Sequence, residues 1–310
     1  MIATVTLNPA LDKCIYIDEL HPHDVNRITK IEIDAGGKGV NASRVLKELG
    51  SHTAALGFIG GRIGSFVEHV LKGEGIHTDF VHLESETRTN ICVQETSGAP
   101  PTTFNEPGSP IPEAEVERLC VKIRKVAKRS SMIIFGGSLP TGAPDDIYRK
   151  LVTIAREEGV RSILDSDGEP MRLGMQASPY MIKPNRDEAE RLVGVKIETL
   201  EDAVRALGLL AESGIEVAVI SMGSRGSVAC SGSNVWQAIP PEVKVVSTIG
   251  SGDSMVAGMA HILSWGGSLD EALRWGTAAG AATAMTDGTE ICRRQQVLDL
   301  LEKVRIERLK

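Results

Sequence analysis

The residues best suited to chemistry lie at 248–258, where Gly250, Ser251, Gly252 and Asp253 lead directly into an apolar helical pattern. Because glycine lacks a Cβ atom, the backbone N–H groups of such a turn can approach a ligand closely. The helix that follows adds free N–H groups and the positive end of its dipole. This stretch therefore predicts a binding site for a phosphate group or a developing negative charge.

Asp253 is unexpected in an anion-binding turn, since a carboxylate repels an anion. One interpretation is a first-turn aspartate that only stabilises the helix, which is the commoner case. The other is a general base that takes a proton from a substrate hydroxyl while the glycine turn holds a phosphoryl group. The stretch alone favours the first interpretation, and the rest of the chain favours the second.

Four other motifs carry polar or charged side chains, and each has a plainer alternative. Residues 36–41 (Gly-Gly-Lys-Gly-Val-Asn) offer N–H groups, a cation and an amide before a helix, for contact with a sugar and its phosphate or as a solvated turn. They are not a Walker A loop, because Lys38 is followed by glycine. Arg88 and Arg27 suit bidentate contact with phosphate, although a surface arginine without a role is more common.

Lys183 begins the third motif, in which Asn185 and Glu188 are three residues apart at the start of a helix. They could position a hydrated Mg²⁺ ion, or they could form a capping box. The fourth motif, residues 221–226 (Ser-Met-Gly-Ser-Arg-Gly), follows a strand and could lie against a nucleotide or be a simple turn.

The elements that must position these residues alternate between strand and helix. Apolar strand patterns cover residues 2–7, 54–59, 131–135, 162–165, 180–183 and 217–221, and helical patterns lie in each interval between them except 166–179. Shorter strand patterns at 227–230, 235–239 and 243–246 precede the glycine turn. This alternation predicts an α/β fold with a doubly wound, mostly parallel sheet flanked by helices. Ligands of such sheets bind beyond the carboxyl ends of the strands, where these candidates stand: Asp12, Ser138, Asp165, Lys183, Asn185 and Ser221.

Two further pairs of strand patterns alternate apolar with polar residues, which suits strands with one wet face. They lie within residues 13–34 and 88–106, and we expect them to form a small β-strand lid inserted into one domain that spans 1–310. The apolar face of such a lid needs cover, so we expect a homodimer that forms through it.

Composition restricts the partners and the compartment. The net charge is -7 and no long basic run occurs, which argues against nucleic acid and anionic membranes as partners. No apolar run is long enough to cross a bilayer, and the five cysteines are scattered without a C-x-x-C pair. We expect a cytoplasmic protein. The first strand lacks the G-x-G-x-x-G fingerprint, which argues against a dinucleotide-dependent oxidoreductase.

Seven motifs, in this order, resemble the PfkB branch of the ribokinase superfamily and, within it, the phosphofructokinases. They lie at 8–12, 36–41, 87–90, 137–140, 183–188, 221–226 and 250–254. The resemblance covers essentially the whole chain, and it implies a ribokinase-like domain with a β lid that often dimerises. It makes Asp253 the catalytic base and Gly250, Ser251 and Gly252 the anion hole, while Asp165 would only shape the cleft.

The resemblance also assigns binding roles. The residues that would hold the sugar phosphate are Asp12, Arg27, Gly37, Lys38, Asn41, Arg88, Asn90 and Ser138. Those that would contact ATP are Lys183, Asn185, Ser221, Gly223 and Gly226, and Asn185 with Glu188 would position Mg²⁺.

The implied activity is transfer of the γ-phosphoryl group of ATP to a primary hydroxyl of a ketohexose monophosphate. Residues 25–27 and Lys38 resemble 1-phosphofructokinases and tagatose-6-phosphate kinases, whereas residues 288–292 resemble the minor 6-phosphofructokinases. Fructose 1-phosphate and fructose 6-phosphate both remain candidates, and both would give fructose 1,6-bisphosphate. The alternatives are a tagatose-6-phosphate kinase, a ribose or nucleoside kinase, and a non-catalytic sugar-phosphate or nucleotide sensor, which would not need Asp253.

Overall fold

The computed structural model describes residues 1–97 and 101–310, which fold around one large, mostly parallel sheet. Its 11 strands lie in the order β15 (Arg305–Arg308), β14 (Asn234–Ile239), β13 (Ser227–Ser231), β12 (Val217–Ser221), β11 (Met181–Ile182), β10 (Arg161–Asp165), β9 (Met132–Gly136), β1 (Ile2–Thr6), β4 (Thr53–Gly60) and β5 (His77–Thr78), with β6 (Val81–Leu83) against β4. The strands from β12 to β5 are parallel, and β13, β14 and β15 are added antiparallel at one edge.

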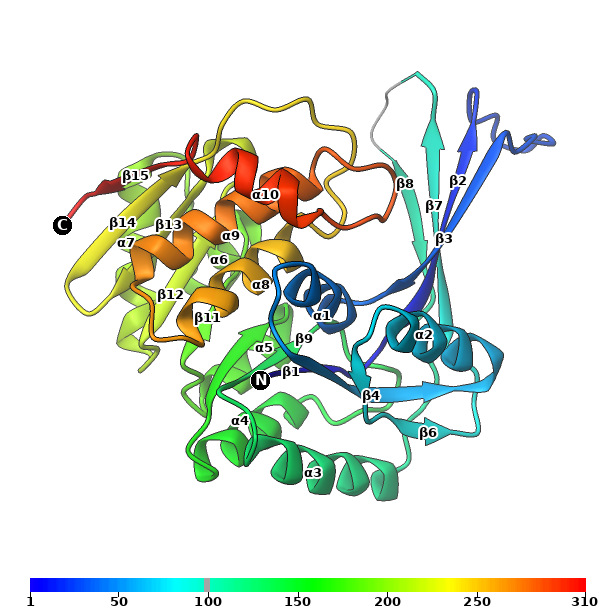
Figure 1. Ribbon diagram of the computed structural model, residues 1–310, viewed down its shortest axis with the longest axis horizontal. Helices are drawn as coiled ribbons and strands as arrows, with labels where there is room; N and C mark the ends of the chain where they lie inside the picture. Colours follow the sequence, from blue (N-terminus) through cyan, green and yellow to red (C-terminus); the bar gives the residue numbers. More distant parts are fainter. Residues whose placement is uncertain (98–100) are drawn as a thin grey trace.

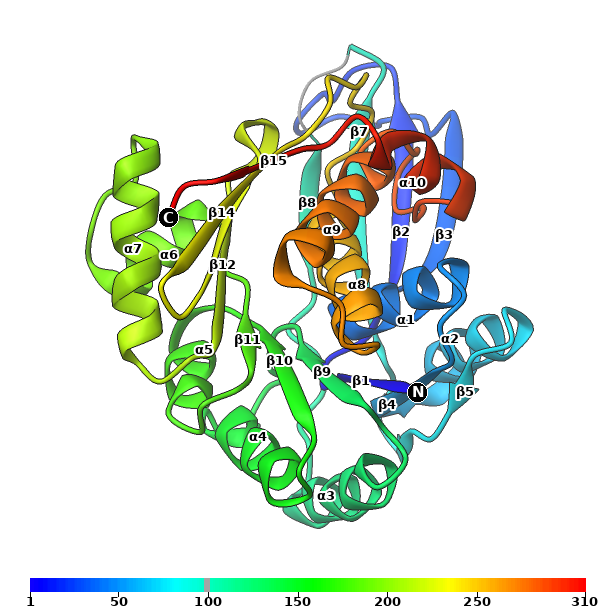
Figure 2. The ribbon, with the colours of Figure 1, turned by 60° about the vertical axis from the view of Figure 1, so that its left-hand side comes forward.

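Helices cover both faces of this sheet (Figures 1 and 2). One layer contains α3 (Glu113–Ala127), α4 (Ile147–Glu157), α5 (Gly168–Met175), α6 (Arg186–Val193) and α7 (Leu200–Glu212). The other contains α1 (Lys38–Glu48), α2 (Gly61–Gly73), α8 (Ser251–Leu263), α9 (Leu269–Thr283) and α10 (Arg294–Leu301). Successive side chains of a strand point to opposite faces, so Ile133 and Ile134 belong to separate cores under the two layers. The predicted doubly wound α/β fold is confirmed.

A second sheet of four strands stands at one end of the molecule (Figure 1). Its order is β3 (Lys30–Gly36), β2 (Ala10–Ile17), β7 (Arg88–Glu95) and β8 (Thr102–Asn105). This small sheet is the extra β element that the alternating patterns predict. One of its faces exposes large apolar side chains, namely Ile31, Ile33, Ile91 and Phe104. Residues 98–100, within the predicted lid segment 88–106, lie outside the described residues.

Other local predictions differ from the structure. The strand predicted at 243–246 is wrong, because this stretch follows an irregular path. Its Val243 and Val245 line a cavity instead, which explains why they are apolar. The helices α5 and α10 and the edge strand β15 were not predicted. Within the predicted lid segment 13–34, β3 begins only at Lys30, so Arg27 lies in the loop before this strand. Within the described residues, none of the helices combines the length and apolar character that a membrane span requires.

Candidate active site

Several predicted site residues line one cavity at the carboxyl edge of the large sheet. Asp165 ends β10, Lys183 follows β11 and Ser221 ends β12, and these parallel strands are neighbours. The cavity beyond them measures about 980 Å³, at the upper end of the range usual for ligand pockets. The predicted residues on its wall are Lys38, Lys183, Asn185, Glu188, Ser221, Gly223, Gly226, Ser251, Gly252 and Asp253.

The glycine turn forms the N-terminus of α8 at this cavity. Gly250 is the N-cap residue and has a φ of 75°, a left-handed conformation that favours glycine. Gly280 on α9 lies so close that an added Cβ atom would be 3.0 Å from the Ser251 carbonyl oxygen, which fixes α9 against the turn. The Ser251 hydroxyl is buried without a hydrogen-bond partner among the described residues. This orphaned group, the free N–H groups and the helix dipole together suit a phosphate ligand.

Asp253 lies in the first turn of α8 and is 9% exposed. Its Oδ2 atom accepts a hydrogen bond from Asn41 Nδ2 on α1 at 2.8 Å. Burial raises the pKa of Asp253 to about 6, even though Lys38 and the bond from Asn41 act to lower it. A carboxylate with this pKa is suited to accept a proton near neutral pH, so its surroundings fit a general base better than a simple helix cap.

Lys38 and Lys183 both line the cavity, and both of their ammonium groups lie near Asp165. Lys38 Nζ lies 2.9 Å from Asp165 Oδ1, and Lys183 Nζ lies 3.8 Å from the same oxygen. Burial alone would lower the pKa of Lys38, but the carboxylates of Asp165, Asp253 and Glu188 outweigh it and hold that pKa above its ordinary value. Burial alone would raise the pKa of Asp165, but Lys183 and Lys38 hold it below its ordinary value. The resemblance assigns Lys38 to the sugar phosphate, but in the structure this lysine lines the 980 Å³ cavity.

Asn185 and Glu188 form the capping box that their spacing allowed. Asn185 Oδ1 accepts from the Glu188 backbone N–H at 2.9 Å, and Glu188 Oε2 accepts from the Asn185 N–H at 2.8 Å. In the described part of the chain, no group of three or more His, Cys, Asp and Glu side chains is arranged to hold a metal ion. Mg²⁺ takes few protein ligands and keeps its waters, so the Glu188 carboxylate on the cavity wall fits such an ion beside nucleotide phosphates.

The far wall of the cavity is built from small and apolar residues. Gly223 begins a short 3₁₀ turn (Gly223–Arg225), and Gly226 passes so close to β14 that an added Cβ atom would lie 2.0 Å from the Ala238 carbonyl oxygen. Val243 and Val245 complete this wall together with Ala281 of α9. Sequence reasoning missed them, although a Gly/Ala-rich helix beside a site is a sign that something packs closely against it.

The small sheet brings a second group of predicted residues to the start of α1. Asp12 on β2 lies directly opposite Asn90 on β7, and Asn90 Nδ2 donates to Asp12 Oδ1 at 2.8 Å. Burial raises the pKa of Asp12 above its ordinary value. The Asn90 Oδ1 atom is buried without a partner among the described residues. Gly37, with a φ of 116°, is the N-cap of the helix that carries Asn41. This end of the site therefore presents a carboxylate and amides, which suit sugar hydroxyls.

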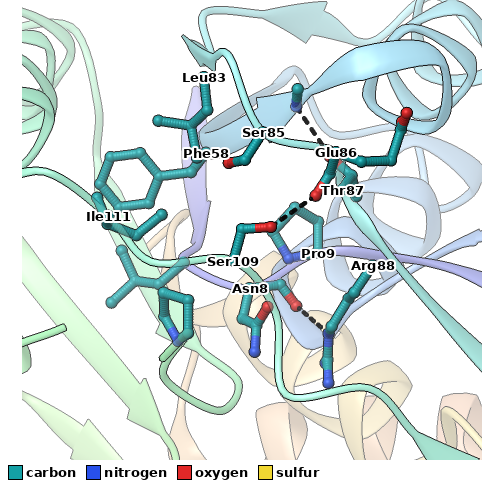
Figure 3. A pocket seen from close by; sticks show the side chains of 13 residues that line it. Asn8, Pro9, Phe58, Leu83, Ser85, Glu86, Thr87, Arg88, Ser109 and Ile111 are labelled. Atoms are coloured by element: carbon teal, nitrogen blue, oxygen red, sulfur yellow. Dashed lines mark hydrogen bonds between the residues drawn. The ribbon is translucent and has the colours of Figure 1, made fainter. Parts of the chain in front are cut away.

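Arg88 lies at the base of the small sheet beside Asn8 (Figure 3). Its Nε atom donates to the Asn8 carbonyl at 3.2 Å and its Nη1 atom to the Glu106 carbonyl at 2.7 Å. The cavity next to it measures about 20 Å³ and is too small for a sugar. Ser138 accepts from Asn8 Nδ2 at 3.3 Å and is exposed. Arg27 is not brought to this group, because it lies exposed in the loop beyond the other end of β2.

Comparison with known proteins agrees with this architecture. A model described as pfkB family carbohydrate kinase matches residues 5–296. The chain is 35% identical over 308 residues to a 1-phosphofructokinase of Borreliella burgdorferi, covering 99% of this chain and 98% of that protein. It is 34% identical over 292 residues to a tagatose-6-phosphate kinase of Staphylococcus epidermidis, covering 93% and 94%. A crystal structure of phosphofructokinase-2 from Escherichia coli in complex with potassium superposes with a TM-score of 0.92 at 30% identity, covering 97% and 98%. This chain belongs to the pfkB family of ATP-dependent carbohydrate kinases.

Proposed function

We propose that the protein is a phosphofructokinase that phosphorylates a primary hydroxyl of a ketohexose monophosphate, with fructose 1-phosphate as the preferred acceptor. The observation that carries this proposal is the buried carboxylate of Asp253, bonded to Asn41, in the first turn of a helix whose N-terminus opens into a nucleotide-sized cavity. The acceptor lies between Asp253 and the small sheet, where Asp12 and Asn90 hold its hydroxyls.

In this reaction Asp253 takes the proton of the acceptor hydroxyl as that oxygen attacks the γ-phosphorus. The new O–P bond forms while the bond to the β-phosphate oxygen breaks, so ADP leaves. The N–H groups at Ser251 and Gly252 stabilise the charge on the transferred group, as preorganised donors do in general. A Mg²⁺ ion would neutralise charge on the nucleotide phosphates, with Glu188 and Asn185 beside it.

The preference for a phosphorylated acceptor is attributed to Arg88, whose guanidinium can form charge-assisted bonds to a phosphate. Arg27 would take part only if a partner subunit brought its loop to the site.

A homodimer through the small sheet is part of the proposal, supported by the exposed Ile31, Ile33 and Phe104. A cytoplasmic location is also part of it, since ATP is abundant there.

A coupled ADP-release assay tests the proposal with fructose 1-phosphate, fructose 6-phosphate, tagatose 6-phosphate, fructose and ribose as acceptors. We expect the phosphorylated ketohexoses to exceed the free sugars in kcat/KM by at least about two orders of magnitude, because charge-assisted bonds contribute roughly 1.5–3 kcal/mol each. An Asp253→Asn sample prepared in parallel serves as the control for ADP that contaminating kinases release. Equal or faster turnover of fructose or ribose would refute the proposal, and sugar-phosphate binding without ADP release would indicate a sensor.

A further inference from the structure

Asp165 is a buried charge for which the proposed reaction has no direct use. It is 2% exposed at the end of β10, and it lies behind the two lysines that line the cavity. Its Oδ1 atom faces both ammonium groups, at 2.9 Å from Lys38 and 3.8 Å from Lys183. Asp165 and Lys183 are buried and Lys38 is half-buried, and burial of charged groups is costly unless they are paired.

We propose that Asp165 is a positioning residue that keeps Lys38 charged, aims both Lys38 and Lys183 at the transferring phosphoryl group, and balances the field of these cations around Asp253. The inference rests on the proposed function, in that the cavity must hold the phosphates of a nucleotide. The motif resemblance assigns Lys38 to the sugar phosphate. In this proposal Lys38 instead contacts the phosphoryl group that is transferred.

The geometry supports this role from three elements. Lys38 is the first residue of α1, and Asn41, one turn later, holds the Asp253 carboxylate. Lys183 lies close to the turn of α8, because an added Cβ atom on Gly252 would be 3.5 Å from its Nζ atom. The two ammonium groups therefore approach the anion-binding turn from α1 and from the end of β11, and the same Asp165 oxygen pairs with both.

The groups that act on Asp253 from the surrounding elements are Lys38, Asp165, Lys183 and Asn41. Lys38 favours the ionised form of Asp253, whereas Asp165 disfavours it. Removal of Asp165 should therefore make Asp253 easier to ionise, and removal of Lys38 should make it harder. If Asp165 only supported packing, its removal and the removal of Lys38 would not shift the ionisation of Asp253 in opposite directions.

The first test compares the acid limb of kcat/KM against pH in the wild type, Asp165→Asn and Lys38→Met. We expect the limb to move to lower pH in D165N and to higher pH in K38M, each by about 0.5–1 unit. The matched control is Asp167→Asn, an exposed aspartate two residues on that caps α5, where asparagine caps equally well. Because the sugar phosphate titrates identically in every variant, the differences report on the enzyme. Shifts in the same direction, or no shift in either variant, would overturn the proposal.

The second test needs no acceptor, so it separates this proposal from the proposed function. Acetic anhydride acylates only unprotonated amines, and peptide mass spectrometry measures the acetylation of Lys38 at pH 8. We expect at least about a fivefold increase in D165N over the wild type and no increase in D167N. An unchanged value in D165N would overturn the proposal even if the enzyme is a phosphofructokinase. If the wild type phosphorylates none of the sugars, the proposed function fails while the labelling still decides the role of Asp165. If D165N does not fold, the acid limb of K38M decides it.

Discussion

Replacement of Asp253 by asparagine should give a protein that turns over far more slowly and yet unfolds less readily at neutral pH. The carboxylate is 9% exposed, and burial is the largest influence on its ionisation. Asparagine has the same shape and can still accept the hydrogen bond from Asn41. The substitution therefore removes a buried charge without leaving a cavity. Loss of a general base typically lowers kcat by ~10²–10⁴-fold.

The size of the stability change follows from the pKa of Asp253, which is raised from the ordinary 3.8 to about 6. Between these two values the folded protein holds a proton that the unfolded chain has lost. The wild type therefore loses stability as pH rises from 4 to 6, and the loss is complete above the folded pKa. At about 1.36 kcal/mol per unit, the penalty at pH 7 is roughly 3 kcal/mol, of which D253N should recover ~1–3 kcal/mol.

Urea unfolding of the wild type and D253N at several pH values from 4.5 to 7.5 measures this difference. All other titrating groups are common to both proteins, so their contributions to the difference in unfolding free energy cancel. The stability advantage of D253N should be small at pH 4.5 and full above pH 6.5. A difference that is independent of pH, or a wild type that is the more stable at pH 7.5, would contradict the burial argument. Near-wild-type turnover by D253N would remove the general-base assignment.

Three further predictions concern ligands and assembly. Glu188→Gln should raise the Mg²⁺ concentration needed for half-maximal rate severalfold, because Mg²⁺ prefers carboxylate oxygens; an unchanged Mg²⁺ dependence would leave Glu188 only its capping role. Arg88→Ala should erase most of the preference for phosphorylated ketohexoses while KM for ATP changes little, as measured across the acceptor panel; a retained preference would place the phosphate elsewhere. Ile33→Glu, on the exposed face of the small sheet at 50% exposure, should turn a dimer into a monomer in sedimentation experiments; a wild type that is already monomeric at micromolar concentration, with and without substrate, would contradict the expected interface.

The fold could be predicted from sequence wherever an apolar pattern arises only from burial of a strand or helix in the core. The strand at β10 and the helix at α8 are apolar because they are buried in the core, and their periods identify them. The prediction failed at residues 243–246, where the same apolar character has another cause. Val243 and Val245 face a cavity rather than a neighbouring strand. Sequence alone does not distinguish these two environments.

The sequence predicted individual residues of the site, but it did not predict which of them form hydrogen bonds or ion pairs with one another. The capping box of Asn185 and Glu188 followed from a spacing of three residues. The bond between Asn41 and Asp253 joins residues 212 apart, and the ion pair of Lys38 with Asp165 joins residues 127 apart. Such pairs depend on how α1, α8 and β10 meet in space, so Asp165 could be recognised from sequence only as a polar residue at a strand end.

The charged side chains around the large cavity have an acidic excess, which bears on how an anionic ligand is attracted to it. Three cations at this cavity, Lys38, Lys183 and Arg186, stand against five carboxylates, so these side chains carry two negative charges in excess when Asp253 is ionised. The carboxylates are those of Asp165, Asp187, Glu188, Glu242 and Asp253. The whole chain is negative as well, at -7. An anionic nucleotide thus gains little from the net side-chain charge. Its attraction must come from fixed dipoles, above all the N–H groups at the start of α8, and from the cation that accompanies it. The charges that act on Asp253 itself, from Lys38, Lys183 and Asp165, partly offset one another and leave burial as the largest influence on its pKa. This pKa therefore lies close to the pH at which a general base is most effective.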